Sequence, residues 1–293
     1  MTGIITKAIG GLYTVDASDG IFECKARGIF RKKKISPMCG DNVIISEDKD
    51  GCVIEEILPR RSELIRPPLA NLDLLVFVSS TVEPKPNTLL LDKFIAIAEF
   101  KKIKPVVVFT KVDKRSSEEL AAVYRSVGID VFECDNVTGE GSAEVRAALQ
   151  GKLSAFTGNT GVGKSSLLNN MYPELGLATG EISKKLGRGR HTTRHVQLYK
   201  LEGGGFIADT PGFSSFDTNR YDIIFKDKLA DCFIEFSEYT DKCRFPDCSH
   251  TKEKGCAVIE AVKEGKIPQS RFDSYLQMYE DAKQLKEWEY KND

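Results

Sequence analysis

The strongest constraint on the fold is the glycine-rich segment Gly158–Ser165, which has the sequence Gly-Asn-Thr-Gly-Val-Gly-Lys-Ser. It fits the pattern G-x-x-x-x-G-K-S and lies between Leu153–Thr157, an apolar run that predicts a buried strand, and a helix predicted from Lys164. In this setting the backbone N–H groups wrap a phosphate chain at the positive end of the helix. The segment therefore predicts an α/β sheet that binds a nucleoside triphosphate, and the complete motif disfavours a merely flexible turn.

The positions of this phosphate loop have expected roles. Lys164 is expected to reach the β- and γ-phosphates, and the Ser165 hydroxyl is expected to ligate Mg²⁺. The residues predicted to bind the nucleotide here are Gly158, Asn159, Thr160, Gly161, Val162, Gly163, Lys164, Ser165 and Ser166. The loop by itself does not choose the base.

The base is chosen by a second motif, Thr110-Lys111-Val112-Asp113, which follows the predicted strand Pro105–Phe109. It resembles the N/T-K-x-D motif of GTPases. In that family the aspartate accepts hydrogen bonds from guanine N1–H and the exocyclic amine, while the lysine stem packs over the ring. Adenine has an acceptor at N1 and no amine there, so Asp113 would reject ATP through unpaired buried groups.

Two further segments resemble GTPase switches. Asp209-Thr210-Pro211-Gly212 follows the predicted strand Phe206–Ala208 and resembles the D-x-x-G motif. There Asp209 would hold Mg²⁺ through a water, and the Gly212 N–H would contact the γ-phosphate. Gly187–Thr193, with the sequence Gly-Arg-Gly-Arg-His-Thr-Thr, stands in the position of switch I. Thr193 is the favoured Mg²⁺ ligand in it, with Thr192 as the alternative.

The motifs occur in circularly permuted order, because the guanine motif at 110 precedes the phosphate loop at 158. Cutting a parallel sheet at one loop and joining the old termini preserves its contacts in space. The loop that completes the base pocket is then expected after Ile129–Phe132, at Asp135–Gly139. GTPases more often carry Ser-Ala there, so Asp135 and Asn136 depart from the pattern, and their role in the pocket stays open.

The remaining sequence predicts two flanking units. Residues 1–67 contain about five short strands with Gly and Asp turns, which is typical of a small OB-fold barrel. Strands alternate with helices over 68–220, whereas 221–293 is expected to be helical, beginning with a helix over Asp222–Phe236. The predicted fold class is multidomain: an N-terminal β-barrel, a central α/β permuted P-loop GTPase and a C-terminal helical zinc-binding module.

The zinc prediction depends on Cys243, Cys248, His250 and Cys256. Their spacing, C-x4-C-x-H-x5-C, supplies three thiolates and one imidazole, which suit a closed tetrahedral Zn²⁺ site of structural role. Chance clustering of buried cysteines is the alternative, and the sequence leaves iron open as the occupant. The metal would replace a hydrophobic core, of which this segment is expected to have little.

Composition limits the class of protein. The 293 residues are 41% hydrophobic and 29% charged, which is typical of a globular chain. The net charge is −1, so the chain has no overall positive charge that would attract nucleic acid. No apolar run approaches the ~18 residues of a membrane-spanning helix, and Met1–Gly10 does not resemble a signal peptide. Without an export signal, the eight cysteines are expected in a reducing cytoplasm.

The permuted order, the switch sequence Gly189–Thr193 and the cysteine cluster together resemble the small-ribosomal-subunit-dependent GTPases of bacteria, the RsgA or YjeQ family. The resemblance covers the whole chain. It implies a factor that binds the late-assembling small subunit and its rRNA, hydrolyses GTP to GDP when docked, and then leaves. Such a factor is expected to be monomeric when free, with Mg²⁺ and one structural Zn²⁺ as cofactors.

Activation of water requires a residue outside the usual position. Many GTPases orient the attacking water with a glutamine after the D-x-x-G glycine, but Phe213 stands there in this chain. His191 is the favoured substitute, since an imidazole near neutral pKa can hold or take a proton. The alternatives are that His191 contacts rRNA phosphate or faces solvent. With Lys164 and Thr193, it completes the expected catalytic set.

Two basic segments are candidates for contact with RNA. The first lies on an expected loop between barrel strands, with Phe30 interleaved, and comprises Lys25, Arg27, Arg31, Lys32, Lys33 and Lys34. The second, around switch I, comprises Lys184, Lys185, Arg188, Arg190 and Arg194. Loops of OB-folds are frequent nucleic-acid surfaces, although a basic loop is often only a solvated face.

Other functions stay open as alternatives. The chain could be an RNA-binding assembly scaffold in which the nucleotide only sets the conformation. A permuted GTPase that acts on the large subunit is disfavoured by the barrel combined with the metal module. An ATP-dependent kinase is disfavoured by Thr110–Asp113.

Overall fold

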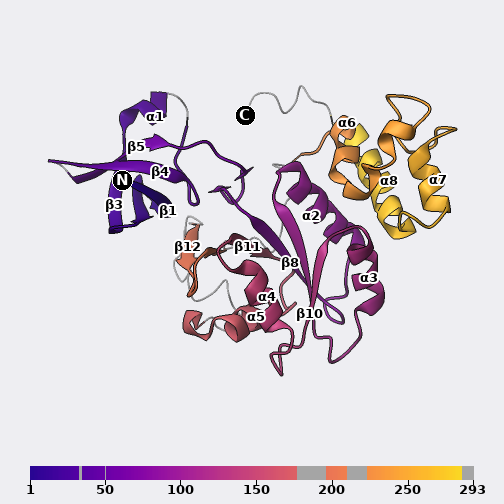
Figure 1. Cartoon of the computed structure of the whole chain (residues 1–293), viewed down its shortest axis with the longest axis horizontal. Helices are drawn as coiled ribbons and strands as arrows, with labels where there is room; N and C mark the ends of the chain where they lie inside the picture. The colour runs from indigo at the N-terminus through magenta and orange to yellow at the C-terminus, as the bar shows by residue number, and fades with distance from the viewer. Residues whose placement is uncertain (33–34, 50, 177–195, 210–222, 286–293) are drawn as a thin grey trace.

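The computed structural model describes residues 1–32, 35–49, 51–176, 196–209 and 223–285. Figure 1 shows three parts in chain order: an indigo barrel, a central sheet with helices against it, and a yellow group of helices beside α2 (Thr88–Phe100). Among the described residues, no helix combines the length and the apolar character needed to cross a membrane.

The N-terminal part is a closed barrel. Its strands are β1 (Thr2–Ile9), β2 (Leu12–Ala17), β3 (Gly20–Ala26), β4 (Asn42–Asp48) and β5 (Gly51–Ile57). They follow the order β1-β2-β3-β5-β4, with β4 paired back onto β1 and β3 parallel to β5. Alternate side chains point inward, so that Ile5, Val15 and Ile54 are fully buried. The predicted OB-fold barrel is confirmed.

The basic segment of the barrel differs from its prediction as a loop. Residues Gly28–Lys32 form a short helix, α1, and Phe30 is 8% exposed and packs into the barrel core. Its burial explains the helix, because one turn directs this ring inward at the end of the barrel. Phe30 is therefore unavailable for stacking on a nucleic-acid base. Lys25, Arg27 and Lys32 remain exposed, while Lys33, Lys34 and the side chain of Arg31 lie outside the described part of the chain.

The central part is a sheet in the order β10-β9-β8-β11-β13-β12, in which β12 is antiparallel to β13 and the other neighbours are parallel. These strands are β8 (Leu74–Ser80), β9 (Lys104–Thr110), β10 (Asp130–Cys134), β11 (Leu153–Thr157), β12 (Gln197–Lys200) and β13 (Phe206–Asp209). Every residue of β8 is buried, as expected of a central strand covered on both faces. The sequence pattern of alternating strands and helices is confirmed.

Helices cover both faces of this sheet. One hydrophobic cluster contains Leu91 and Phe94 of α2 with Tyr124 of α3 (Glu118–Ser126). A separate cluster contains Val145 of α4 (Ser142–Leu149) and Leu167 of α5 (Lys164–Met171). Hence α2 and α3 lie against one face and α4 and α5 against the other, which leaves the strand ends free to carry loops.

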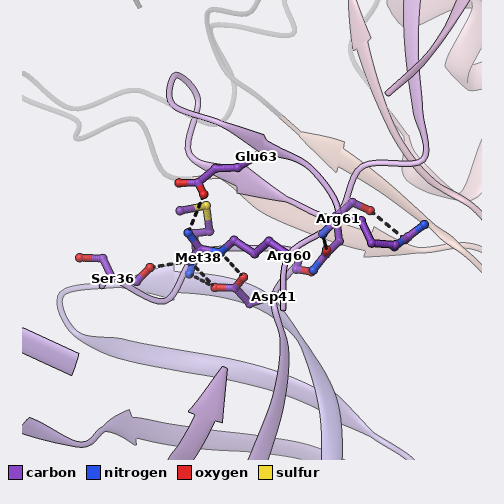
Figure 2. Close-up of polar contacts among 8 residues, drawn as sticks. Ser36, Met38, Asp41, Arg60, Arg61 and Glu63 are labelled. Atoms are coloured by element: carbon purple, nitrogen blue, oxygen red, sulfur yellow. Dashed lines mark hydrogen bonds and ion pairs between the residues drawn. The ribbon is translucent and has the colours of Figure 1, made fainter. Parts of the chain in front are cut away.

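The barrel is joined to the sheet by a linker whose contacts Figure 2 shows. The Arg60 guanidinium donates to both carboxylate oxygens of the fully buried Asp41, at 2.7 and 2.9 Å. The neighbouring Arg61 donates to Asp73 at 2.9 Å, and Asp73 accepts from the N–H of Leu153 at 2.8 Å. Two successive arginines thus bind the linker to the barrel on one side and to the sheet on the other.

The two sheets are also continuous. Lys7 of β1 pairs with Gln197 of β12, and Lys200 of β12 forms an ion pair with Asp16 of β2 at 2.8 Å. The Cys39 thiol donates to the carbonyl of Val196 at 3.1 Å, and both residues are buried. The barrel therefore covers the β12 edge of the central sheet.

The C-terminal part is built from α6 (Lys226–Leu229), short 3₁₀ turns, α7 (Ala257–Lys263) and α8 (Gln269–Lys283). The prediction of one helix over Asp222–Phe236 is wrong in its described portion, because the chain after α6 forms the 3₁₀ turns η2 (Ala230–Cys232) and η3 (Ile234–Phe236). An extended backbone at Phe233 separates these turns. It lets Phe233 and Phe236 stack, with ring centroids 5.2 Å apart, and pack on Tyr275.

A buried arginine fastens this C-terminal module to the central domain. Arg271 of α8 is 1% exposed, and its guanidinium lies 2.7 Å from Asp92 of α2. It also donates to both carboxylate oxygens of Glu235, at 2.7 and 3.1 Å, and stacks over Phe233. Burial raises the pKa of Asp92, and Arg271 offsets part of that rise. Each charge is therefore tolerated only because its partner is present.

Replacement of Arg271 by Leu is expected to lower the free energy of unfolding by about 3–5 kcal/mol, because Asp92 and Glu235 would stay buried without a counter-charge. Urea unfolding of the two proteins measures this difference. Lys93→Ala is the matched control, since its pair with Asp281 spans the same two helices at 3.0 Å but is partly exposed and is expected to be worth less than about 1 kcal/mol. Equal losses in both variants would contradict the importance of the buried pair.

Candidate nucleotide site and metal site

The predicted nucleotide motifs follow strands whose carboxyl ends meet at one edge of the sheet. β8 is parallel to β9 and to β11, with Ser80 opposite Thr110 and Phe77 opposite Thr157. β11 is parallel to β13, which ends at Asp209. This edge is where ligands bind in open α/β sheets.

The phosphate loop after β11 needs glycine at particular positions. Gly158 has φ +134°, and a Cβ there would lie 2.1 Å from the carbonyl oxygen of Val78. Gly161 and Gly163 have φ of +83° and +95°, a region that other residues rarely adopt. Gly163 precedes the first residue of α5, so the loop opens directly onto a helix N-terminus, where N–H groups are unpaired.

Lys164 lies inside this loop. Its ammonium donates to the carbonyls of Gly158 and Asn159, the second at 2.8 Å. Burial lowers the pKa of Lys164 to about 8. Ser165 is 9% exposed in the first turn of α5, adjacent to Lys164. Both side chains are thus held at the loop, where a phosphate would gain a cation and a hydroxyl.

The guanine motif is tied to the phosphate loop by two side chains. Thr110 donates through its hydroxyl to the carbonyl of Val162, at 2.5 Å, and Lys111 donates to that of Gly161, at 2.8 Å. Asp113 is exposed at the end of the motif. The carboxylate that would select guanine is therefore exposed, and it lies on a segment that two hydrogen bonds attach to the phosphate loop.

The segment 81–87 after β8 contributes contacts that the sequence analysis missed. The Thr81 hydroxyl donates to the Lys111 carbonyl at 2.7 Å, and the carbonyl of Glu83 accepts from the Lys111 ammonium. The sequence feature that could have indicated residues 81–87 is their position, since they follow a buried strand at the same sheet edge as the other motifs. These contacts hold Lys111 in its left-handed backbone conformation, with φ +59°.

The loop that departs from the GTPase pattern, Asp135–Gly139, is ordered by its own side chains. The Asp135 carboxylate accepts from the N–H of Val137 at 2.7 Å and from the Thr138 hydroxyl at 2.8 Å, and these hydrogen bonds lower its pKa. Asn136 donates through its side-chain amide to the carbonyl of Gly163 at 3.0 Å. Asp135 therefore shapes the loop, and Asn136 reaches the phosphate loop.

Several predicted residues lie outside the part of the chain that the structure describes. They are His191, Thr192, Thr193 and Gly212, together with Lys184, Lys185, Arg188, Arg190 and Arg194. For Asp209 the backbone is placed, at the end of β13 with Gln197 opposite it. The phosphate loop and the guanine motif are thus brought together, and the roles of the switch residues stay predictions.

The predicted metal ligands also converge. The ligand atoms of Cys243, Cys248, His250 and Cys256 all lie within 4.8 Å of one another. The Cys243 and Cys256 sulfurs are 3.9 Å apart, and His250 Nδ1 lies 3.5 Å from the first and 3.4 Å from the second. Tetrahedral Zn²⁺ with bonds of roughly 2.0–2.3 Å needs ligand separations of about 3.5–3.8 Å. The four residues can therefore hold a metal ion.

The protonation of these ligands depends on whether a cation is bound. Burial lowers the pKa of His250, which favours the neutral imidazole that binds metal. Burial raises the pKa of Cys248 to about 12 and also raises that of Cys256. A bound cation would supply the charge that deprotonates such thiols. The loop around them is fixed by Glu253, which accepts from the N–H groups of Ser249, Thr251 and Lys252 at 3.0 Å.

Comparison with known families identifies this arrangement. The family model described as RsgA GTPase matches residues 57–219, and that described as RsgA N-terminal domain matches residues 2–53. Small ribosomal subunit biogenesis GTPase RsgA of Caldanaerobacter subterraneus subsp. tengcongensis is 45% identical, over 99% of this chain and 98% of the relative. The protein of that name from Geobacillus kaustophilus is 43% identical, over 97% and 98%.

Solved structures agree with the sequence matches. YjeQ from Thermotoga maritima superposes with a TM-score of 0.83 at 33% identity, covering 97% of this chain and 99% of that one. YloQ, described as a circularly permuted GTPase, superposes with a TM-score of 0.80 at 36% identity, covering 97% and 96%. The permuted motif order and the N-terminal barrel thus agree with the family models and with YloQ, and the chain belongs to the RsgA family of circularly permuted GTPases.

Proposed function

We propose that this GTPase binds the small ribosomal subunit, assists its late maturation, hydrolyses GTP when docked and then dissociates. The observation that carries the GTP site is the attachment of the guanine motif to the phosphate loop through Thr110 and Lys111. The printed names of relatives at 43–45% identity over nearly the whole chain support the ribosomal role. We also propose that the protein is cytoplasmic and monomeric when free. Its proposed domains are the OB-fold barrel over residues 1–67, the permuted GTPase domain over 68–220 and the zinc-binding helical module over 221–293.

In the proposed reaction a water attacks the γ-phosphate in line with the leaving oxygen. Lys164 neutralises charge on the β- and γ-oxygens, and the N–H groups of the phosphate loop bind the same oxygens. Ser165 and Thr193 would hold Mg²⁺, with Asp209 contacting it through water, and Mg²⁺ would supply charge neutralisation at the phosphates. Gly212 would bind the γ-phosphate, and His191 would orient the water.

Contact with rRNA is assigned to the basic surface of the barrel. Lys25, Arg27 and Lys32 are exposed around α1, although Arg27 is paired with Glu55. Since Phe30 is buried, this surface would bind phosphates by charge rather than bases by stacking. Such binding is expected to weaken as the salt concentration rises.

GTP hydrolysis measured with the purified protein alone, with small subunits and with large subunits tests the proposal, with ATP as the control nucleotide. Stimulation by small subunits alone is expected. His191→Ala is expected to bind GTP normally but to lose the stimulated turnover by a factor of about 10²–10⁴, the usual contribution of a positioned acid–base group. Equal turnover with and without subunits would refute the docking role, and unchanged turnover in the variant would refute the role of His191.

The pKa of Lys164 predicts a pH dependence of nucleotide binding. The free protein loses the Lys164 charge as the pH rises through about 8, whereas bound phosphates would favour the charged form. Affinity for GDP is therefore expected to fall about five- to tenfold between pH 7.0 and 8.8. Equilibrium titration with fluorescent GDP measures this fall. Lys164→Arg stays charged and is expected to bind more weakly with a flat profile, so a parallel decline in both proteins would contradict the assignment.

The ligand cluster is proposed to hold one structural Zn²⁺. Cys248→Ser is expected to lose the metal and to lower the melting temperature, because the metal stabilises the fold of this loop. Metal analysis after gel filtration and thermal unfolding give the two readouts. Cys232→Ser is the matched control, since this cysteine lies in the same module, is buried and donates to the Lys228 carbonyl away from the cluster. Full retention of zinc by Cys248→Ser would exclude the proposed site.

A further inference from the structure

Three consecutive carbonyl groups of the phosphate loop accept hydrogen bonds from segments that bind the base. Gly161 accepts from Lys111 and Val162 accepts from Thr110, both of which belong to the guanine motif. The third, Gly163, accepts from the side-chain amide of Asn136 at 3.0 Å. Asn136 belongs to the other loop of the base pocket, so both base-binding loops hold the same stretch of phosphate-binding backbone.

The contact of Asn136 with Gly163 is close and depends on the glycine. A Cβ on Gly163 would lie 2.6 Å from Asn136 Nδ2. The Gly163 carbonyl also accepts the helical hydrogen bond from Leu167 at 2.9 Å, so Asn136 binds the loop where it enters α5. The backbone carbonyl of Asn136 accepts from the side chain of Asn170, on α5, at 3.1 Å. Asn136 is therefore linked twice to the phosphate-binding unit.

The oxygen atom of the Asn136 side-chain amide is left without a donor. This Oδ1 is buried and accepts no hydrogen bond from the described residues. A buried acceptor without a donor costs free energy, so the amide oxygen lowers the stability of the free protein. The amide NH₂ group, by contrast, joins the two loops through its hydrogen bond to Gly163.

We propose that Asn136 is a positioning residue that holds the base-binding loop against the phosphate loop and thereby slows release of the guanine nucleotide. The inference depends on the proposed GTP site. It assigns a role to one of the two positions at which this chain departs from the usual Ser-Ala sequence. Asn136 acts through the Gly163 carbonyl and not by contact with the base, whose recognition is assigned to Asp113.

The rate of release of fluorescent GDP, measured by stopped flow after mixing with excess unlabelled GDP, tests this role. Asn136→Ala is expected to release GDP about fivefold faster, as loss of one net hydrogen bond implies. Asn136→Asp has the same shape without the donor and is expected to be at least as fast. Glu144→Gln, at an exposed position in the first turn of α4, is the control that should match the unaltered protein.

Two readouts separate positioning from other roles. Asn136→Ala should accelerate release of GDP and of inosine diphosphate by the same factor, because the amine that distinguishes them is assigned to Asp113. Its melting temperature without nucleotide should not fall, since the variant also removes the unpaired Oδ1. Unchanged release from Asn136→Ala, with normal binding by the unaltered protein, would overturn this inference alone. Failure of the unaltered protein to bind GDP would overturn the proposed GTP site and the inference together.

Discussion

The parallel pairing of β8 with β9 on one side and β11 on the other is the interaction on which the site depends. These ladders place the ends of three strands side by side although β11 lies far along the chain from the other two. Gly158 then packs on the backbone of Val78, and Thr110 reaches Val162. Because the ladders are local in space, the order in which the chain visits the strands does not matter to the site. This is why a chain with permuted motif order can keep the GTPase fold.

The two flanking parts attach to the central domain in different ways, but each attachment includes a buried ion pair. The barrel is joined by backbone pairing at β12 and by the linker, in which Arg60 pairs with the fully buried Asp41, as Figure 2 shows. The C-terminal module is held by apolar packing around the buried ion cluster at Arg271. Loss of either arginine would leave a buried carboxylate without its counter-charge, which has a large cost at a single residue.

The sequence predicted the elements whose signals are local. Thr88–Phe100, for example, combines helical apolar spacing with a cap at Asn87, and Gly265, with φ +72°, directly follows the C-cap of α7. The metal-ligand cluster could be predicted because its three cysteines and one histidine lie within fourteen residues, which keeps them close together in space. The role of Phe30 and the break at Phe233 depend on partners distant in sequence, namely the barrel core and Tyr275, so no local pattern could reveal them. The contact of Asn136 with Gly163 was hidden for the same reason, although the unusual residue was visible.

The Arg271 cluster has a further consequence for helix α2. Asp92, the partner of Arg271, lies on this helix, and Ala96 and Ile97 belong to the hydrophobic cluster of the C-terminal module. Leu91 and Phe94 of the same helix belong to the cluster that covers the sheet. One helix is therefore shared by two cores, so local unfolding of the module would expose one side of α2 while its other side stayed packed.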